Sequence, residues 1–362
     1  MKIVKIETGE LFIPLIRPFK TALRTVSGVE DIAVRVTVDD GRCGYGEAPP
    51  TAVITGETKG SILAAIREHI GPAVVGMEVD CLEEVLQKIQ SCMVKNTSAK
   101  AAVDMAVYDL FGQLYGAPLY RLLGGARASL ETDVTISVND VDTMVADSLE
   151  AVGRGYHILK VKVGKEGLAD VPRIAAIRRA VGPDIQIRVD ANQGWTAGDA
   201  VRIITAMEDQ GLDIQLVEQP VPAHDLEGMR RVTRAVDTPI LADESVFSAA
   251  DALNIIQTGA ADLINIKLMK TGGIYNALKI CAVAEIHEVR CMIGCMLESK
   301  LSVSAGAHLA CAKGIIALAD LDGPSLCAAD PFEGGPAYNE NIISMTDRPG
   351  IGITSVPVAR WT

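Results

Sequence analysis

The sequence predicts an α/β protein built around a closed barrel of parallel strands, with an α+β segment before it. Two observations carry this prediction. From residue 131 onward, apolar runs of strand length alternate with helical patterns, and such alternation is typical of a parallel sheet. Five of these runs end in a single charged residue, at steps of 28, 28, 25 and 24 residues: Lys162, Asp190, Glu218, Asp243 and Lys267. Each step fits one strand–helix unit, so the charges would meet at the C-terminal mouth of a barrel.

The composition and the net charge of the chain restrict the classes of protein to which it can belong. The chain has 362 residues, of which 49% are hydrophobic, so it can bury a large core and is long enough for two domains. A formal net charge of −12 argues against nucleic acid or an anionic membrane as partner. No apolar run approaches the roughly 18 residues of a membrane span, and charges interrupt residues 1–7, unlike in a signal peptide. The eight cysteines form no Cys-x-x-Cys pair, which favours a reduced, cytoplasmic protein.

The N-terminal part, residues 1–123, has the pattern of an α+β domain. Apolar stretches predict strands over residues 3–16 and 32–39, with a glycine-rich turn and a continuation at 41–46. Helical patterns follow over residues 58–70, 81–93 and 98–115. The polar segment 17–29 lies between two strands, and we expect it to be a loop that covers a site.

Residues 124–322 contain the strand–helix alternation of the barrel. We predict strands over residues 133–138, 158–163, 185–191, 214–219, 240–243, 263–267, 291–296 and 315–320. Eight strands favour closure into a barrel, and no Gly-x-Gly-x-x-Gly follows the first strand, which disfavours an open dinucleotide-binding sheet. Residues 323–362 are irregular, with several Gly-Pro turns, and we expect this tail to pack back on the N-terminal domain.

Three carboxylates at consecutive strand ends form the strongest candidate site. Asp190, Glu218 and Asp243 would repel one another at the barrel mouth unless a cation lies among them. Hard oxygen ligands favour Mg²⁺, or Mn²⁺, over Zn²⁺. The alternative is that each carboxylate forms a separate salt bridge at its strand end, but three in consecutive units favour the metal.

Lys162 and Lys267 lie one strand before and one strand after these carboxylates. A nearby divalent cation and partial desolvation both lower the pKa of a lysine toward that of a usable base. From opposite faces of a metal-held carboxylate, two such amines can exchange the proton on the adjacent carbon through an enediolate. Lys160, on the same strand face as Lys162, is expected to donate to the substrate carboxylate. The alternative, lysines that extend to solvent, has little room inside a barrel.

Five motifs together carry a family resemblance: Lys-Val-Lys (160–162), Val-Asp-Ala-Asn-Gln-Gly-Trp (189–195), Val-Glu-Gln-Pro (217–220), Ala-Asp-Glu-Ser (242–245) and Asn-Ile-Lys-Leu-Met-Lys-Thr-Gly-Gly (265–273). As a set they resemble the enolase superfamily, muconate-lactonizing subgroup, whose sites use a Lys or His base with Mg²⁺. The resemblance implies a modified TIM barrel, (β/α)₇β, with an N-terminal capping domain completed by the C-terminal tail. It also implies that Asp190, Glu218 and Asp243 are metal ligands. Lys162 and Lys267 would be the two acid–base catalysts. A homo-oligomer is an expectation at the family level.

The last predicted strand carries information about the substrate. Asp320 and Asp322 are two residues apart, so an extended strand places both on one face, and a cationic group of the substrate is their natural partner. The alternative is an ordinary turn at Asp322-Gly323. An Asp-x-Asp at this place resembles the dipeptide epimerases, where it holds the substrate's α-ammonium. This implies a small-molecule dipeptide, epimerised at its C-terminal residue. The nearest rivals, N-succinylamino acid racemases and o-succinylbenzoate synthases, have no free ammonium to hold.

Three further residues are candidates for substrate binding. Residues 18–26 are similar to the mobile capping loop of L-Ala-D/L-Glu epimerases, in which an arginine matching Arg24 meets the glutamate carboxylate. The expected substrate is therefore L-Ala-D/L-Glu from peptidoglycan turnover, although Arg24 also fits an ordinary solvated cation. Glu298 matches a seventh-strand glutamate of the subgroup and is expected to support Lys267, and Thr135 is a candidate for substrate contact. A barrel that only binds is a rival from another class, and the intact catalytic lysines argue against it.

Overall fold

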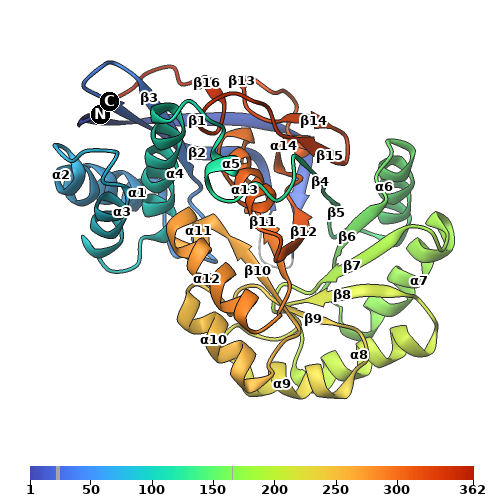
Figure 1. The fold of residues 1–362 in the computed structure, drawn as a ribbon. Helices are drawn as coiled ribbons and strands as arrows, with labels where there is room; N and C mark the ends of the chain where they lie inside the picture. The colour runs from blue at the N-terminus through green and yellow to red at the C-terminus, as the bar shows by residue number, and fades with distance from the viewer. Residues whose placement is uncertain (22–24, 165) are drawn as a thin grey trace.

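The computed structural model describes residues 1–21, 25–164 and 166–362. A barrel of parallel strands, surrounded by helices, lies against a second domain of antiparallel strands and helices from the N-terminal part of the chain (Figure 1). Both ends of the chain lie in this second domain. The predicted fold class, a barrel with an N-terminal capping domain, is confirmed, whereas the domain limits at residues 123 and 322 stay a prediction.

A three-stranded antiparallel sheet, in the order β1-β2-β3, forms the capping domain together with its helices. Its strands are β1 (Ile3–Lys20), β2 (Thr25–Val38) and β3 (Cys43–Ala48). The prediction of a loop was wrong for residues 17–20 and 25–29, because Phe19 pairs with Val26 and Lys20 with Thr25. That prediction used the polarity of the side chains, but strands pair through backbone groups that every residue carries.

The helices of the capping domain follow the sheet in the chain. They are α1 (Lys59–Ala64), the π-helical η1 (Ala65–Ile70), α2 (Gly71–Val74), α3 (Leu82–Ser91), α4 (Thr97–Leu114) and α5 (Leu119–Leu122). The longest, α4, packs directly on β3. A Cβ atom at Gly44 or Gly46 would lie 2.1 or 1.9 Å from a carbonyl oxygen of α4, so this close approach requires glycine. The three predicted helical stretches are confirmed: α2 continues the first one to Val74, α3 is shorter than predicted, and α4 is displaced by one residue.

Eight parallel strands form the barrel in the part of the chain that the structure describes. They are β5 (Val134–Ile136), β6 (Ile158–Lys162), β7 (Gln186–Asp190), β8 (Ile214–Glu218), β9 (Ile240–Ala242), β10 (Leu263–Lys267), β11 (Cys291–Gly294) and β12 (Ile316–Asp320). Each strand pairs with the next in chain order, from β5 to β12. Between the two end strands, the Asp133 backbone N–H donates to the Ala319 carbonyl at 3.4 Å. All eight predicted strands are confirmed.

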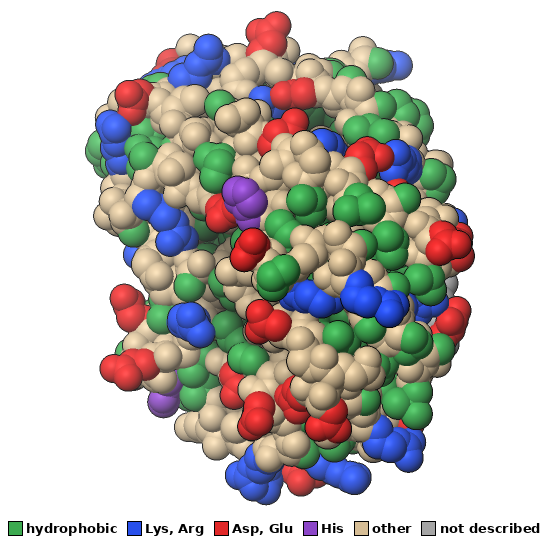
Figure 2. Space-filling model, turned by 90° about the vertical axis from the view of Figure 1, so that its right-hand side faces the viewer, with side chains coloured by type: hydrophobic (Ala, Val, Ile, Leu, Met, Phe, Trp, Pro, Cys, Tyr) green, Lys and Arg blue, Asp and Glu red, His purple; other side chains and the backbone are tan. Residues whose placement is uncertain are grey.

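Helices cover the outside of the barrel (Figure 1). They are α6 (Val141–Gly153), η2 (Gly167–Ala169), α7 (Asp170–Val181), α8 (Ala197–Asp209), α9 (Leu226–Ala235), α10 (Ala249–Thr258), α11 (Leu268–Thr271), α12 (Ile274–Ile286) and α13 (Lys300–Ala312). On the face in Figure 2, acidic and basic side chains are interspersed among apolar ones. No helix among the described residues has the length and apolarity that crossing a bilayer requires.

The C-terminal tail returns to the N-terminal part of the chain. It contains α14 (Gly323–Leu326), β13 (Glu333–Gly334), β14 (Ala337–Asn339), β15 (Ile342–Ser344) and β16 (Ile353–Ser355). Strand β15 pairs with β4 (Ser129–Glu131), and Thr362 exchanges two backbone hydrogen bonds with Thr8 of β1, both at 2.9 Å. The Arg35 guanidinium also lies over the Trp361 ring, 4.7 Å from its centroid. The tail therefore packs where the sequence analysis expected it.

Two buried carboxylates of the capping domain cap helices of the barrel. Glu47, at the end of β3, accepts hydrogen bonds from the backbone N–H groups of Ser299 and Ser302, at the start of α13. Asp104 of α4 accepts from the backbone N–H groups of Ile274 and Tyr275, at the start of α12. Both satisfy N–H groups that have no partner within their own helix, so the two domains share the capping of these helices.

Candidate active site

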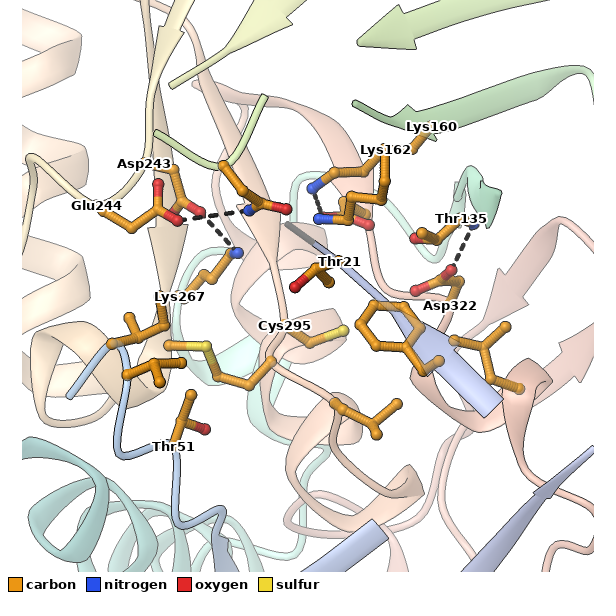
Figure 3. Close-up of a pocket in the computed structure, with 18 residues that line it drawn as sticks. Thr21, Thr51, Thr135, Lys160, Lys162, Asp243, Glu244, Lys267, Cys295 and Asp322 are labelled. Carbon is orange, nitrogen blue, oxygen red and sulfur yellow. Dashed lines mark hydrogen bonds and ion pairs between the residues drawn. The ribbon is translucent and has the colours of Figure 1, made fainter. Parts of the chain in front are cut away.

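A small cavity of about 60 Å³ lies where the barrel strands end and the capping domain covers them (Figure 3). The capping domain contributes side chains from the end of β1 and from the loop after β3, among them Phe19, Thr21 and Thr51. The barrel contributes seven of the predicted site residues: Thr135, Lys160, Lys162, Asp243, Lys267, Asp320 and Asp322. The spacing of charged strand ends therefore located a real cluster.

The three predicted ligand carboxylates lie at neighbouring strand ends, and each is no more than 1% exposed. Asp190 on β7 is in register with Glu218 on β8, and Asp243 follows the end of β9. Backbone and amide donors hold their oxygens in place. The Asn192 backbone N–H donates to Asp190 Oδ1 at 2.8 Å, and Asn265 Nδ2 donates to Glu218 Oε1 at 2.9 Å.

Lysine ammonium groups lie against all three carboxylates. Lys160 Nζ is 3.1 Å from Asp190 Oδ2 and 2.7 Å from Glu218 Oε2. Lys162 Nζ is 2.5 Å from Asp190 Oδ2, and Lys267 Nζ is 2.8 Å from Asp243 Oδ2. Lys162 and Lys267 reach into the cavity from opposite sides (Figure 3). The ammonium charges thus compensate a cluster of anions that would otherwise be unstable when buried.

The donor set fits a hard divalent cation by its chemistry. Three buried carboxylates converge from adjacent strands, and the neighbouring Asn192 Oδ1 and Glu244 Oε2 are buried without a hydrogen-bond partner. Such oxygens are the ligands that Mg²⁺ prefers. As the side chains stand, no three His, Cys, Asp or Glu residues in the described ranges are grouped tightly enough to hold a metal ion. Lysine ammonium groups contact the carboxylate oxygens instead.

The pKa of Lys267 is shifted in the direction opposite to the expectation. Burial lowers it, but the negative charges of Asp243 and Glu218 outweigh burial and raise the pKa above its ordinary value. The pKa of Lys160 is likewise raised, because nearby carboxylates including Asp320 overcome the effect of burial. The expectation counted the charge of a nearby divalent cation together with desolvation, whereas the neighbouring carboxylates stabilise the ammonium form.

Asp320 and Asp322 lie together at the wall of the cavity, but in different environments. Lys160 Nζ lies 2.6 Å from Asp320 Oδ2, and although burial raises the pKa of Asp320, the charges of Lys160 and other lysines lower it to about 2. Asp322 accepts a hydrogen bond from the Thr135 backbone N–H at 2.7 Å (Figure 3). Burial and the charge of Asp320 raise the pKa of Asp322 to about 6.

Glu298 has partners other than Lys267. Its carboxylate accepts hydrogen bonds from the Met296 backbone N–H at 2.6 Å and from the Ser302 hydroxyl. Burial raises its pKa to about 7, and the Lys267 charge lowers it less than the hydrogen bonds from Ser302 and Met296 do. No hydrogen bond joins Glu298 to Lys267 among the described side chains, so this glutamate shapes the wall of the cavity at Met296. The Arg24 prediction lies outside the described residues.

Sequence reasoning missed Lys270, which holds a predicted ligand in place. Its side chain is fully buried, and Nζ lies 2.5 Å from Asp243 Oδ1 and donates to the Asn265 carbonyl at 3.0 Å. The available signal was a second lysine three residues after Lys267, in a stretch that contains no acidic residue. Cys295 also lines the cavity.

Comparison with known proteins places this geometry in a family. Residues 143–357 match the enolase C-terminal domain-like family, and residues 7–124 match the N-terminal domain of mandelate racemase / muconate lactonizing enzyme. The chain is 52% identical to the L-Ala-D/L-Glu epimerase of Clostridium acetobutylicum, with 98% of this chain and 99% of the relative covered. It is also 51% identical to the L-Ala-D/L-Glu epimerase of Bacillus subtilis, with 98% of this chain and 97% of the relative covered.

Solved structures agree with these relatives. A substrate-liganded complex of the L-Ala-D/L-Glu epimerase from Bacillus subtilis superposes with a TM-score of 0.96 at 51% identity, covering 98% of this chain and 99% of that one. The dipeptide epimerase of Enterococcus faecalis, complexed with Mg and L-Leu-L-Tyr, gives a TM-score of 0.94 at 41% identity, with 98% and 100% covered. From both its domains and its near full-length relatives, the chain belongs to the enolase superfamily, in the group of mandelate racemase and muconate lactonizing enzyme.

Proposed function

We propose that the protein is an isomerase that epimerises the C-terminal residue of a dipeptide, with L-Ala-L-Glu as substrate. The observation that carries the proposal is the pair of lysines, Lys162 and Lys267, on opposite sides of a cavity that Asp320 and Asp322 also line. The relatives at 52% and 51% identity are both L-Ala-D/L-Glu epimerases, which supports this choice of dipeptide.

The proposed mechanism moves one proton from each side of the α-carbon. One lysine takes the α-proton on its Nζ as the neutral amine, and the other, as the ammonium, donates a proton to the opposite face. Inversion of the α-carbon follows because the two groups, Lys162 and Lys267, face each other across the cavity. In this proposal Lys160 donates to the substrate carboxylate, and Asp320 with Asp322 bind the α-ammonium by charge.

Asp190, Glu218 and Asp243 are the residues that would hold Mg²⁺, or Mn²⁺, in this proposal. A divalent cation held by these residues would supply positive charge that stabilises the substrate carboxylate when the α-proton is removed. The cation would then replace some of the contacts that the three carboxylates make with lysines. The relative from Enterococcus faecalis whose structure contains Mg and a dipeptide supports the choice of metal.

A racemase of N-acylated amino acids is the second candidate. The N-succinyl-L-Arg/Lys racemase of Bacillus cereus is 36% identical over 98% of this chain, so this activity occurs among the relatives. The two buried carboxylates Asp320 and Asp322 favour the dipeptide, because a succinyl group would place a further anion beside them.

The test is ¹H NMR in D₂O with Mg²⁺, using L-Ala-L-Glu, L-Ala-L-Phe and N-succinyl-L-Arg in parallel. We expect the C-terminal α-proton signal of L-Ala-L-Glu to disappear and the L,D diastereomer to form. Exchange of L-Ala-L-Phe alone would keep the mechanism and exclude the glutamate substrate. Exchange of N-succinyl-L-Arg alone would replace the proposal with the racemase.

A further inference from the structure

A second, larger cavity lies directly beside the active site. It has a volume of about 460 Å³ and is open to solvent between the end of β1, strand β5 and helix α6. Its walls are largely apolar, with Ile16, Pro18 and Ile136 among them. None of the residues assigned to proton transfer or metal binding lines it.

Three side chains separate the two cavities. Phe19, Thr135 and Leu326 each line both the active-site cavity and the second cavity. Phe19 comes from the capping domain, Thr135 from the barrel strand β5 and Leu326 from α14, so the partition is assembled from three distant segments. We refer to these three residues as the partition.

The partition lies next to Asp322, which together with Asp320 is proposed to bind the α-ammonium of the substrate. The Thr135 backbone N–H donates to Asp322 Oδ2 at 2.7 Å, and Leu326 lies in the short helix that Asp322 precedes. In the proposed function, Asp320 and Asp322 bind the α-ammonium of the dipeptide. The side chain of the N-terminal residue branches one bond away from that nitrogen, so it begins beside the partition.

The size and chemistry of the second cavity fit an apolar side chain. The active-site cavity measures about 60 Å³ and the second one about 460 Å³, so the space beyond the partition has room for a large group. The two arginines that line it, Arg17 and Arg154, have partners of opposite sign, and Arg154 contacts Glu340 at 3.0 Å. Arg17 contacts Asp147 at 2.5 Å and Glu150 at 2.6 Å, so these three charges compensate one another.

We propose that Phe19 and Leu326 limit the N-terminal residue of the substrate to a small side chain, and that the cavity behind them is a latent site for a large apolar one. This inference rests on the proposed function. It predicts that shortening either side chain joins the two cavities and admits N-terminal leucine or phenylalanine.

The test compares kcat/KM for α-proton exchange with L-Ala-L-Glu, L-Leu-L-Glu and L-Phe-L-Glu. For the wild-type protein we expect L-Ala-L-Glu to be preferred by at least about tenfold, the scale on which apolar pockets discriminate side chains. Leu326→Ala and Phe19→Ala should each raise the ratio of L-Leu-L-Glu to L-Ala-L-Glu by about tenfold or more. Because the readout is a ratio, a general loss of activity does not imitate the effect.

Two further variants sharpen the test. Ala146 faces the second cavity from α6 and is exposed, so a larger side chain is tolerated there. Adding Ala146→Phe to Leu326→Ala should refill the cavity and return the ratio toward the wild-type value. Leu149→Ala, on the same helix but lining neither cavity, is the matched control and should leave the ratio unchanged.

The outcomes separate the inference from the proposed function. If L-Ala-L-Glu is exchanged but the ratios stay the same in Leu326→Ala and Phe19→Ala, the partition does not limit the substrate. Equal use of L-Leu-L-Glu and L-Ala-L-Glu by the wild-type protein would contradict it as well. Absence of exchange with all three dipeptides would refute the proposed function, and the inference with it.

Discussion

Lys160 shows how much a single side chain in this site depends on its surroundings. It is 1% exposed, and its ammonium group lies within about 3 Å of carboxylate oxygens of Asp190, Glu218 and Asp320. A buried cation in such a position neutralises part of the charge of the cluster. A divalent cation at the same carboxylates would compete with it, which frees Lys160 to donate to a substrate carboxylate.

The two lysines proposed to move protons give the first residue-scale prediction. Lys162→Ala or Lys267→Ala should lower the rate of α-proton exchange of L-Ala-L-Glu by about 10²- to 10⁴-fold, because one of the two proton-transfer groups is lost. ¹H NMR in D₂O measures this rate. Each variant also removes a cation that pairs with a buried carboxylate, Asp190 or Asp243, so thermal unfolding must show that it remains folded at the assay temperature.

Lys88→Ala is the matched control for these two variants, because Lys88 is exposed on α3 and lies far from the cavity in the capping domain. It should exchange the α-proton at the wild-type rate. Wild-type exchange by Lys162→Ala or Lys267→Ala, in folded protein, would remove that lysine from the mechanism.

At the scale of elements, the end of β1 joins the capping domain to the barrel. The Lys20 backbone N–H donates to Ser137 Oγ at 3.2 Å, and Lys20 accepts from the Val138 backbone N–H at 3.2 Å. Arg17 adds ion pairs with Asp147 and Glu150 of α6. Because Phe19 and Thr21 lie on either side of Lys20 in the chain and line the cavity, these contacts hold one wall of the active site in place.

Arg17 is accordingly expected to act as a positioning residue. Arg17→Glu would place like charges beside Asp147 and Glu150, and KM for L-Ala-L-Glu should rise about two- to fivefold, which is the scale of exposed ion pairs. Steady-state kinetics at low ionic strength measure it, since salt screens such pairs. Combining Arg17→Glu with Asp147→Lys and Glu150→Lys should restore KM. A KM that stays raised in the triple variant would exclude the ion pairs as the cause.

Glu47 gives a second prediction at this scale. It is fully buried and caps α13 through Ser299 and Ser302, so Glu47→Ala should leave donors without a partner at the domain interface. The free energy of unfolding in urea should fall by about 1–3 kcal/mol. Glu285→Ala, an exposed position on α12, is the control and should change it by less than about 0.5 kcal/mol. Equal effects of the two substitutions would contradict the capping role.

At the scale of the whole molecule, the C-terminal tail joins the first strand and the central helix of the capping domain. Asp109 of α4 is fully buried and accepts hydrogen bonds from the Ile351 backbone N–H at 2.9 Å and from the Tyr45 backbone N–H at 3.1 Å. Burial raises its pKa to about 7, although both backbone donors lower it. One carboxyl group thus connects tail, helix and sheet.

The raised pKa of Asp109 makes stability depend on pH. The folded protein holds a proton that the unfolded chain releases near pH 4, so this contribution to stability is complete below about pH 4. It is lost progressively as pH rises through about 7. Urea unfolding should show that the wild-type protein loses more stability between pH 5 and pH 8 than Asp109→Asn does. Parallel pH profiles of the two proteins would contradict the assignment.

The sequence by itself determined the barrel, the capping domain and the residues at the strand ends. Asp190, Glu218, Asp243, Lys162 and Lys267 could be placed because strand periodicity and the length of a strand–helix unit are local properties. Parallel strands bring their C-terminal ends to one side, so residues close to each strand end meet whatever the details of packing.

Only the tertiary structure decided which side chains meet across distant parts of the chain. The pairing of Phe19 with Val26, the contacts of Glu298 with Met296 and Ser302, and the partition at Leu326 follow from packing between segments. The direction of the Lys267 pKa shift was also decided by the tertiary structure. Burial and nearby carboxylates shift this pKa in opposite directions, and their balance depends on distances of a few ångströms.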